Sequence, residues 1–237
     1  MTAPFARPAI KLVAALAALL FAACQRTGKA PAPKWEATGK FAGKYAITSS
    51  ANPGSTRPGY TGSVQVTQQG QHYVFDWKLD TGQSYSGFAL ETGQFLAAGW
   101  GTGGAYGVVV YEITGGRLDG RWASSRSGGK LGSEQLQGPP GPNGSYEIVD
   151  SYAPETGKSY SGRVAIQPNG NIYRMLWSAG GRLYSGVGIK KGNLLLAGWG
   201  VSGGAVVVYT IREGGLLNGQ WAHSASSQLG SEYLKKG

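Results

Sequence analysis

The segment Tyr73-Val74-Phe75-Asp76-Trp77-Lys78-Leu79 places Tyr, Phe, Trp and Leu at every second position. Successive side chains of a β-strand point to opposite faces, so this spacing predicts a strand with one large apolar face. The same pattern returns as Tyr173-Arg174-Met175-Leu176-Trp177. The strand therefore belongs to a longer repeated unit.

The repeat extends in both directions from this strand, and residues 60–136 recur as 160–234 with the same landmarks in the same order. The matched pairs are Tyr60-Thr61-Gly62 with Tyr160-Ser161-Gly162, Tyr85-Ser86-Gly87 with Tyr184-Ser185-Gly186, Ala98-Gly99-Trp100-Gly101 with Ala197-Gly198-Trp199-Gly200, Trp122-Ala123 with Trp221-Ala222, and Leu131-Gly132-Ser133-Glu134 with Leu229-Gly230-Ser231-Glu232. A tandem duplication predicts two domains of similar fold.

Strand spacing recurs through each copy, with turn signals such as Gln69-Gly70 and Asn169-Gly170 between the strands. In the first copy we expect strands within 45–48, 60–66, 71–79, 84–90, 95–100, 106–113, 117–123 and 134–137. That makes about eight short strands per copy. Helical spacing with capping residues is absent after the amino-terminal segment.

The glycines indicate how the sheets curve. In Leu118-Asp119-Gly120-Arg121-Trp122 and its copy Leu217 to Trp221, Leu, Gly and Trp share one strand face. Glycine there lets a sheet bend and leaves room for a neighbouring aromatic ring. A sheet bent so often is expected to close, which also removes its exposed edges.

We therefore predict an all-β protein of two tandem antiparallel up-and-down β-barrels, with two packed sheets per copy as the alternative. The expected organisation is an amino-terminal signal helix over 1–23, a flexible tether over 24–42, a first barrel over 43–137, a Pro/Gly linker over 138–143 and a second barrel over 144–237. The linker assignment rests on Gly138-Pro139-Pro140-Gly141-Pro142, because proline stiffens a segment and removes ladder donors.

Composition narrows the class of protein. The chain has 41 glycines without a strict every-third-residue pattern, which excludes collagen, and its regular aromatic and aliphatic content argues against disorder. The formal net charge of +10 favours acidic partners or surfaces, but the basic residues form no dense run. Nucleic-acid binding would need a denser stripe of basic and aromatic residues.

The single cysteine excludes an internal disulfide, and its position indicates another role. Arg7 and Lys11 precede a short apolar run that ends in Leu20-Phe21-Ala22-Ala23-Cys24. This segment resembles the bacterial lipobox, in which a signal peptide is cleaved before a cysteine that then carries lipid. The resemblance implies lipidation, such as palmitate, at Cys24 and, from Gln25 after it, an outer-membrane address. A plain signal peptide with an incidental cysteine is the alternative.

Several catalytic or cofactor motifs can be set aside. Gly99-x-Gly101-x-x-Gly104 and Gly198-x-Gly200-x-x-Gly203 match a dinucleotide fingerprint in letters, but that motif must open a helix, and strand patterns follow it here. We interpret both as hairpin turns. The two histidines, His72 and His223, lie at unrelated positions and there is no second cysteine, so we expect no metal site. The two copies share no catalytic constellation, so we expect no cofactor and no enzyme activity.

The candidate ligand-binding residues come from the parts that both copies keep. Glu134 and Glu232 are the matched carboxylates, and we expect each mainly to accept hydrogen bonds from tyrosines, an arginine or turn amides. Trp100 and Trp199 are expected in the core or, together with Tyr85 and Tyr184, at barrel mouths where they stack on a flat ligand.

The repeat, with its Tyr-x-Gly starts, Gly-Trp-Gly units and Gly-Ser-Glu close, resembles bacterial surface proteins described as fibronectin-binding, and its plan is similar to small calycin-like barrels such as avidin. These resemblances imply a non-catalytic, lipid-anchored envelope protein that binds a matrix or envelope macromolecule. A carrier of small hydrophobic ligands is the alternative. The oligomeric state is left open.

Overall fold

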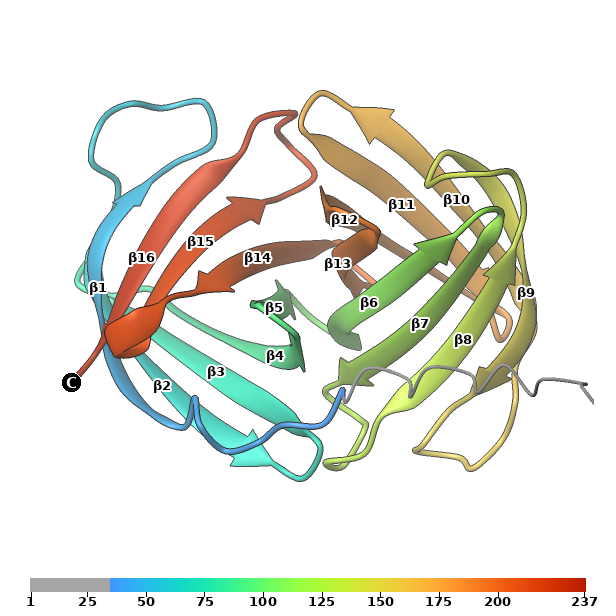
Figure 1. The fold of residues 1–237 in the computed structure, drawn as a ribbon, viewed down its shortest axis with the longest axis horizontal. Helices are drawn as coiled ribbons and strands as arrows, with labels where there is room; N and C mark the ends of the chain where they lie inside the picture. Colours follow the sequence, from blue (N-terminus) through green and yellow to red (C-terminus); the bar gives the residue numbers. More distant parts are fainter. Residues whose placement is uncertain (1–34) are drawn as a thin grey trace, which may run out of the picture. The chain divides into compact units, whose positions relative to one another are not determined.

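A computed structural model describes residues 35–237 and shows sixteen β-strands (Figure 1). The strands are β1 Gly43–Ala51, β2 Gly62–Gln69, β3 His72–Leu79, β4 Ser84–Thr92, β5 Phe95–Gly101, β6 Tyr106–Thr114, β7 Arg117–Ser124, β8 Gly132–Gln137, β9 Gly144–Tyr152, β10 Gly162–Asn169, β11 Ile172–Ala179, β12 Arg182–Lys191, β13 Leu194–Gly200, β14 Gly204–Ile211, β15 Leu216–Ala222 and β16 Gly230–Lys236. One 3₁₀ turn, Glu213–Gly215, precedes β15. The predicted signal segment and Cys24 lie outside the described residues.

The strands close into two antiparallel eight-stranded barrels (Figure 1). Barrel 1 has the strand order β1-β16-β15-β14-β5-β4-β3-β2, and barrel 2 has the order β10-β11-β12-β13-β6-β7-β8-β9. The predicted fold class is confirmed, and because each sheet closes, the alternative of two packed sheets is not realised. Among residues 35–237, no helix has the length and apolarity needed to cross a membrane.

The assignment of one barrel to each repeat is wrong. Barrel 1 takes β1–β5 from the first repeat and β14–β16 from the second, whereas barrel 2 is the continuous run β6–β13. The ranges 43–137 and 144–237 therefore delimit sequence repeats and not barrels. The 138–143 segment does not separate domains, because β8 and β9 on either side of it pair with each other in barrel 2.

The two Gly-Trp-Gly segments are the points where the chain passes between barrels. Strand β5 pairs with β4 and β14, and β6 pairs with β7 and β13, so the 101–105 connection is not the expected hairpin. A strand does follow the glycines, as predicted. Close approach explains one glycine here, because a Cβ on Gly99 would lie 2.3 Å from the carbonyl oxygen of Gly107 on β6.

Three apolar clusters stabilise this arrangement. One fills barrel 1 and a second fills barrel 2. The third joins the outer faces of the barrels and includes Val206 and Val208 of barrel 1 with Val108 and Val110 of barrel 2. The intervening Val109 and Val207 point into the barrels. Strands β6 and β14 are thus buried on both faces, which explains their uninterrupted valine runs.

The last part of the predicted tether is packed against barrel 1. Trp35 and Phe41 are buried, and the backbone amide of Ala37 donates to the carbonyl of Gln71 at 3.0 Å. Lys40 forms a 2.5 Å ion pair with the buried Glu91. Phe41 belongs to the core of barrel 1, and Trp35 belongs to the cluster between the barrels. Residues 35–42 are therefore an ordered cap on barrel 1, and the tether prediction is wrong for these residues.

Candidate functional site

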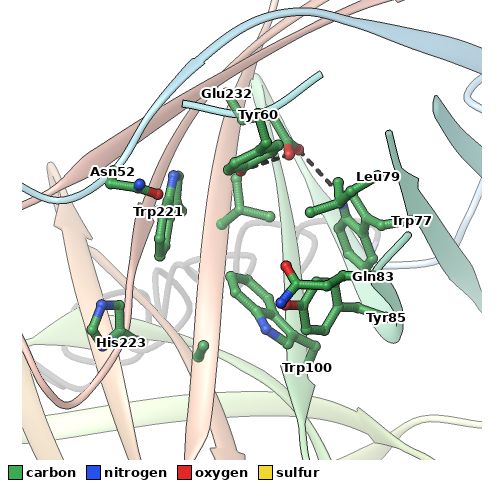
Figure 2. A pocket seen from close by; sticks show the side chains of 12 residues that line it. Asn52, Tyr60, Trp77, Leu79, Gln83, Tyr85, Trp100, Trp221, His223 and Glu232 are labelled. Atoms are coloured by element: carbon green, nitrogen blue, oxygen red, sulfur yellow. Dashed lines mark hydrogen bonds between the residues drawn. The ribbon is translucent and has the colours of Figure 1, made fainter. Parts of the chain in front are cut away.

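Barrel 1 is filled at the capped end and hollow at the other. Near the cap, Phe41, Tyr73 and Phe75 pack inside the barrel. Beyond them lies a pocket of about 260 Å³. Figure 2 shows its lining side chains, which come from β3, β4, β5, β14, β15 and β16 and from the β1–β2, β3–β4 and β15–β16 connections: Asn52, Tyr60, Trp77, Leu79, Gln83, Tyr85, Trp100, Ala205, Val207, Trp221, His223 and Glu232.

Aromatic rings form the wall of this barrel-1 pocket. The ring centroids of Trp77 and Trp100 lie 5.8 Å apart, and those of Trp100 and Trp221 lie 6.3 Å apart. Tyr60 lies beside Trp221 at 6.5 Å. Trp100 and Trp221 are only half-buried, so they present ring surface to the cavity. An aromatic wall of this kind offers stacking and edge contacts to a flat ligand.

The carboxylate of Glu232 lies at the inner end of the same pocket and is almost fully buried (Figure 2). The Tyr60 hydroxyl donates to Oε2 at 2.9 Å, the Trp77 indole donates to Oε1 at 3.2 Å, and the Tyr209 hydroxyl also donates to Oε1. Burial raises the pKa of Glu232, and these donors oppose the rise. The same burial, with the neighbouring carboxylate, raises the pKa of Tyr60 and of Tyr209.

Barrel 2 carries an equivalent but larger pocket of about 360 Å³. Its lining includes Trp122, Trp177, Trp199, Tyr160, Tyr184 and Glu134, which correspond in the repeat to Trp221, Trp77, Trp100, Tyr60, Tyr85 and Glu232. The ring centroids of Trp122 and Trp199 lie 6.2 Å apart, and those of Tyr184 and Trp199 lie 5.2 Å apart. Six of the seven tryptophans therefore line the two pockets.

The carboxylate of Glu134 is buried and accepts hydrogen bonds from two tyrosines, as that of Glu232 does. The Tyr160 hydroxyl donates to Oε2 at 3.0 Å, and the Tyr111 hydroxyl donates to Oε1. Indole groups extend the network, since Trp177 donates to the Tyr111 oxygen at 2.9 Å and Trp122 donates to the Tyr160 oxygen at 3.0 Å. Burial raises the pKa of Glu134 against the effect of these donors.

These bonds confirm that each glutamate accepts hydrogen bonds from tyrosines. At Glu232 the Trp77 indole donates as well, whereas no arginine and no turn amide donates to either carboxylate within residues 35–237.

The glycine of each Leu-Gly-Ser-Glu unit makes room for a pocket indole. A Cβ on Gly132 would lie 2.0 Å from Cε2 of Trp122, and one on Gly230 would lie 2.4 Å from Nε1 of Trp221. The strand that carries the glutamate thus also lets an indole lie flat against its backbone. The packing of an aromatic ring over glycine that the Leu-x-Gly-x-Trp units predict is found at Gly120 and Gly219, where a Cβ would lie 2.7 Å from the ring of Tyr111 and 2.8 Å from that of Tyr209.

All six candidate residues line the pockets, but their grouping crosses the repeats. Tyr85 and Trp100 of the first repeat share a pocket with Glu232 of the second, and Tyr184 and Trp199 share one with Glu134. The sequence interpretation missed Tyr60, Trp77, Trp221 and their counterparts as pocket residues. Their signal was present, because each belongs to a landmark that both copies keep.

The two histidines lie in different places. His72 is buried outside the barrel interiors with its ring 5.6 Å from that of Phe88, and His223 lines the barrel-1 pocket. No three metal-ligating side chains come together in the part of the chain that the structure describes.

Comparison of the sequence and structure with protein-family models, curated proteins and solved structures found no match.

Proposed function

We propose that this chain is a non-catalytic binding protein whose two barrels each hold a small, ring-bearing ligand. The observation that carries the proposal is the pair of concave pockets, each walled by three indoles and two phenols. Small-molecule sites are typically concave, mostly apolar and fitted with a few polar groups, with volumes from about 300 Å³ upward. Volumes of about 260 and 360 Å³ favour a ligand of one or two rings.

The polar groups of each pocket support binding without chemistry. The oxygens of Glu134 and Glu232 already accept hydrogen bonds from phenol groups, and Glu232 also accepts one from an indole. A general acid or base needs a proton path to a reacting atom, whereas these carboxylates fix the positions of the rings around them. Their proposed role is to hold the aromatic wall in shape for a ligand.

This proposal corresponds to the alternative function expected from the sequence, a carrier of small hydrophobic ligands. Binding of a matrix or envelope macromolecule remains a prediction. Such a molecule would fit these pockets if it presents a ring, such as a sugar or an aromatic side chain, at its surface. Two pockets on one chain would then increase the overall affinity for a partner with repeated rings.

Tryptophan fluorescence tests the pocket proposal directly. The full chain is titrated with indole, naphthalene-2-carboxamide and naphthalene-2-carboxylate, and saturable quenching by at least one of them is expected. Trp100→Ala and Trp199→Ala should each remove the response of one pocket. Trp35→Phe is the matched control, because Trp35 lies outside both pockets. The absence of saturable quenching with all three compounds would refute the proposal.

We also propose that the protein is anchored by lipid on Cys24, which lies outside the described residues. The support is the lipobox-like segment before this cysteine. Expression in a bacterium with labelled palmitate should give a labelled, detergent-partitioning protein, and Cys24→Ser should abolish both properties. An unlabelled, water-soluble wild-type protein would contradict the anchor and leave the pocket proposal untouched.

A further inference from the structure

The two pockets share their aromatic walls and differ at their rims. In barrel 1 the side chain after the β3–β4 turn is Gln83, whose carbonyl accepts from the amide of Leu79. In barrel 2 the corresponding position is Arg182, which pairs with Ala179 across the β11–β12 turn. The rim of the second pocket thus carries a guanidinium where the first carries a neutral amide.

A second arginine lies on the same rim. Arg126 follows Trp122 by four positions, and the residue at that place after Trp221 is Ala225. The Arg126 backbone is fixed in a tight turn, because its amide donates to Oγ of Ser124 at 3.1 Å. Barrel 2 therefore brings two guanidinium groups to one mouth from two different turns.

Neither arginine is neutralised by an ion pair within residues 35–237. The ion pairs of that region are Lys40 with Glu91, Arg117 with Asp119 and Arg163 with Glu147. Glu155 also lines the barrel-2 pocket and carries the one acidic charge of its rim, so the two arginines leave an excess positive charge there. An anionic ligand group, such as a carboxylate, can accept paired, charge-assisted hydrogen bonds from a guanidinium.

The inner end of the pocket decides which way such a ligand lies. Glu134 is buried there, and an anionic group beside it would face a carboxylate. The ring therefore enters first, between Trp199 and Trp122, and the anionic group stays at the rim. Barrel 1 offers Asn52, Gln83 and His223 at its mouth in place of arginine.

We propose that the barrel-2 pocket selects a ring-bearing ligand with an anionic substituent such as a carboxylate, and that the barrel-1 pocket has no such preference. This inference rests on the proposed binding function. The chain would then carry two different ligands, or two parts of one ligand, on pockets of common design.

The experiment compares naphthalene-2-carboxylate with naphthalene-2-carboxamide by isothermal titration calorimetry, using the full chain with Trp100→Ala to silence the barrel-1 pocket. The carboxylate should bind about three- to tenfold more tightly than the amide at low salt, which corresponds to about 0.7–1.4 kcal/mol. Added salt should reduce the difference, because the rim charges are exposed.

Adding Arg126→Gln and Arg182→Gln should weaken carboxylate binding by that same factor and leave amide binding unchanged. Arg163→Gln is the matched control, since Arg163 is an exposed arginine of barrel 2 outside the pocket. Equal binding of both compounds, or a preference that survives the double substitution, would overturn the inference and leave the proposed function standing. Failure of both compounds to bind would refute the proposed function itself.

Discussion

The hydroxyl of Tyr60, two residues before β2, donates a 2.9 Å hydrogen bond to the carboxylate of Glu232 on β16, the last strand of the chain. The two residues belong to different repeats, and their bond lies inside barrel 1. Tyr160 and Glu134 form the corresponding bond in barrel 2 at 3.0 Å. Each pocket is therefore completed by a glutamate that the other repeat supplies.

Removing one of these carboxylates should destabilise the protein. Glu232→Ala leaves two phenols and the Trp77 indole without their acceptor, and we expect the free energy of unfolding to fall by about 2–4 kcal/mol. Glu232→Gln keeps one acceptor oxygen and should cost less. Urea denaturation followed by circular dichroism measures both changes. The exposed Glu213→Gln is the control and should stay within about 0.5 kcal/mol of wild type. Equal stability of Glu232→Ala and the control would contradict the structural role of the network.

Filling the space beside an indole should disturb one pocket selectively. In Gly132→Ala the new methyl group would overlap Trp122, so the indole must move, at a cost of about 1–3 kcal/mol. The near-ultraviolet circular dichroism of the tryptophans should change together with the unfolding midpoint. Ser133→Ala alters the next residue on the same strand and should leave both unchanged. An unaltered tryptophan signal in Gly132→Ala would show that Trp122 does not lie against Gly132.

Acid should weaken the protein through His72. Both ring nitrogens of this buried histidine lack hydrogen-bond partners, and burial lowers its pKa from 6.5 to about 4. The unfolded chain binds the proton more readily, so stability is lost as the pH falls from about 6.5 to 4, by on the order of 2–3 kcal/mol. Urea midpoints across this range should fall in wild type and in His223→Gln, and fall less in His72→Leu. Parallel pH profiles in wild type and His72→Leu would argue against this effect.

Fragments should distinguish barrels from repeats. Residues 106–200 contain all eight strands of barrel 2, so this fragment should show the near-ultraviolet signal of packed tryptophans. Residues 35–137 contain five strands of one barrel and three of the other, and they can close both barrels only when two copies exchange strands. Sedimentation should therefore give a dimer for the second fragment. A folded monomer of 35–137 would show that a repeat can close by itself.

The fold class could be predicted because alternation and turn glycines are local signals. The partner of each strand could not, because Val108-Val109-Val110-Tyr111 and Val206-Val207-Val208-Tyr209 are nearly interchangeable neighbours for β5. Side-chain chemistry hardly separates these two pairings. The connection between Gly101 and Ala105 is short enough for a hairpin as well. The close approach of Gly99 to Gly107 accompanies the crossing, and it cannot be read from hydrophobic periodicity.

The candidate site could likewise be predicted only in part, because some of its residues are marked by the sequence repeat and others are brought together only by the fold. Repetition identified Trp100, Trp199, Glu134 and Glu232, since both copies keep them. Repetition cannot identify Arg126 and Arg182, because their counterparts are neutral and the two residues are distant in the chain. The difference between the pockets appeared only once the barrel mouths were assembled.

The insertion of barrel 2 between β5 and β14 sets the order in which the molecule can be completed during synthesis. Barrel 2 has all its strands when residue 200 has been made. Barrel 1 cannot close until β16, which ends at Lys236, pairs with β1. Strands β1–β5 must wait with open edges while the whole of the other barrel is produced. A nascent chain of this design therefore spends most of its elongation with an aggregation-prone edge, which a chaperone or an early contact with barrel 2 would have to cover.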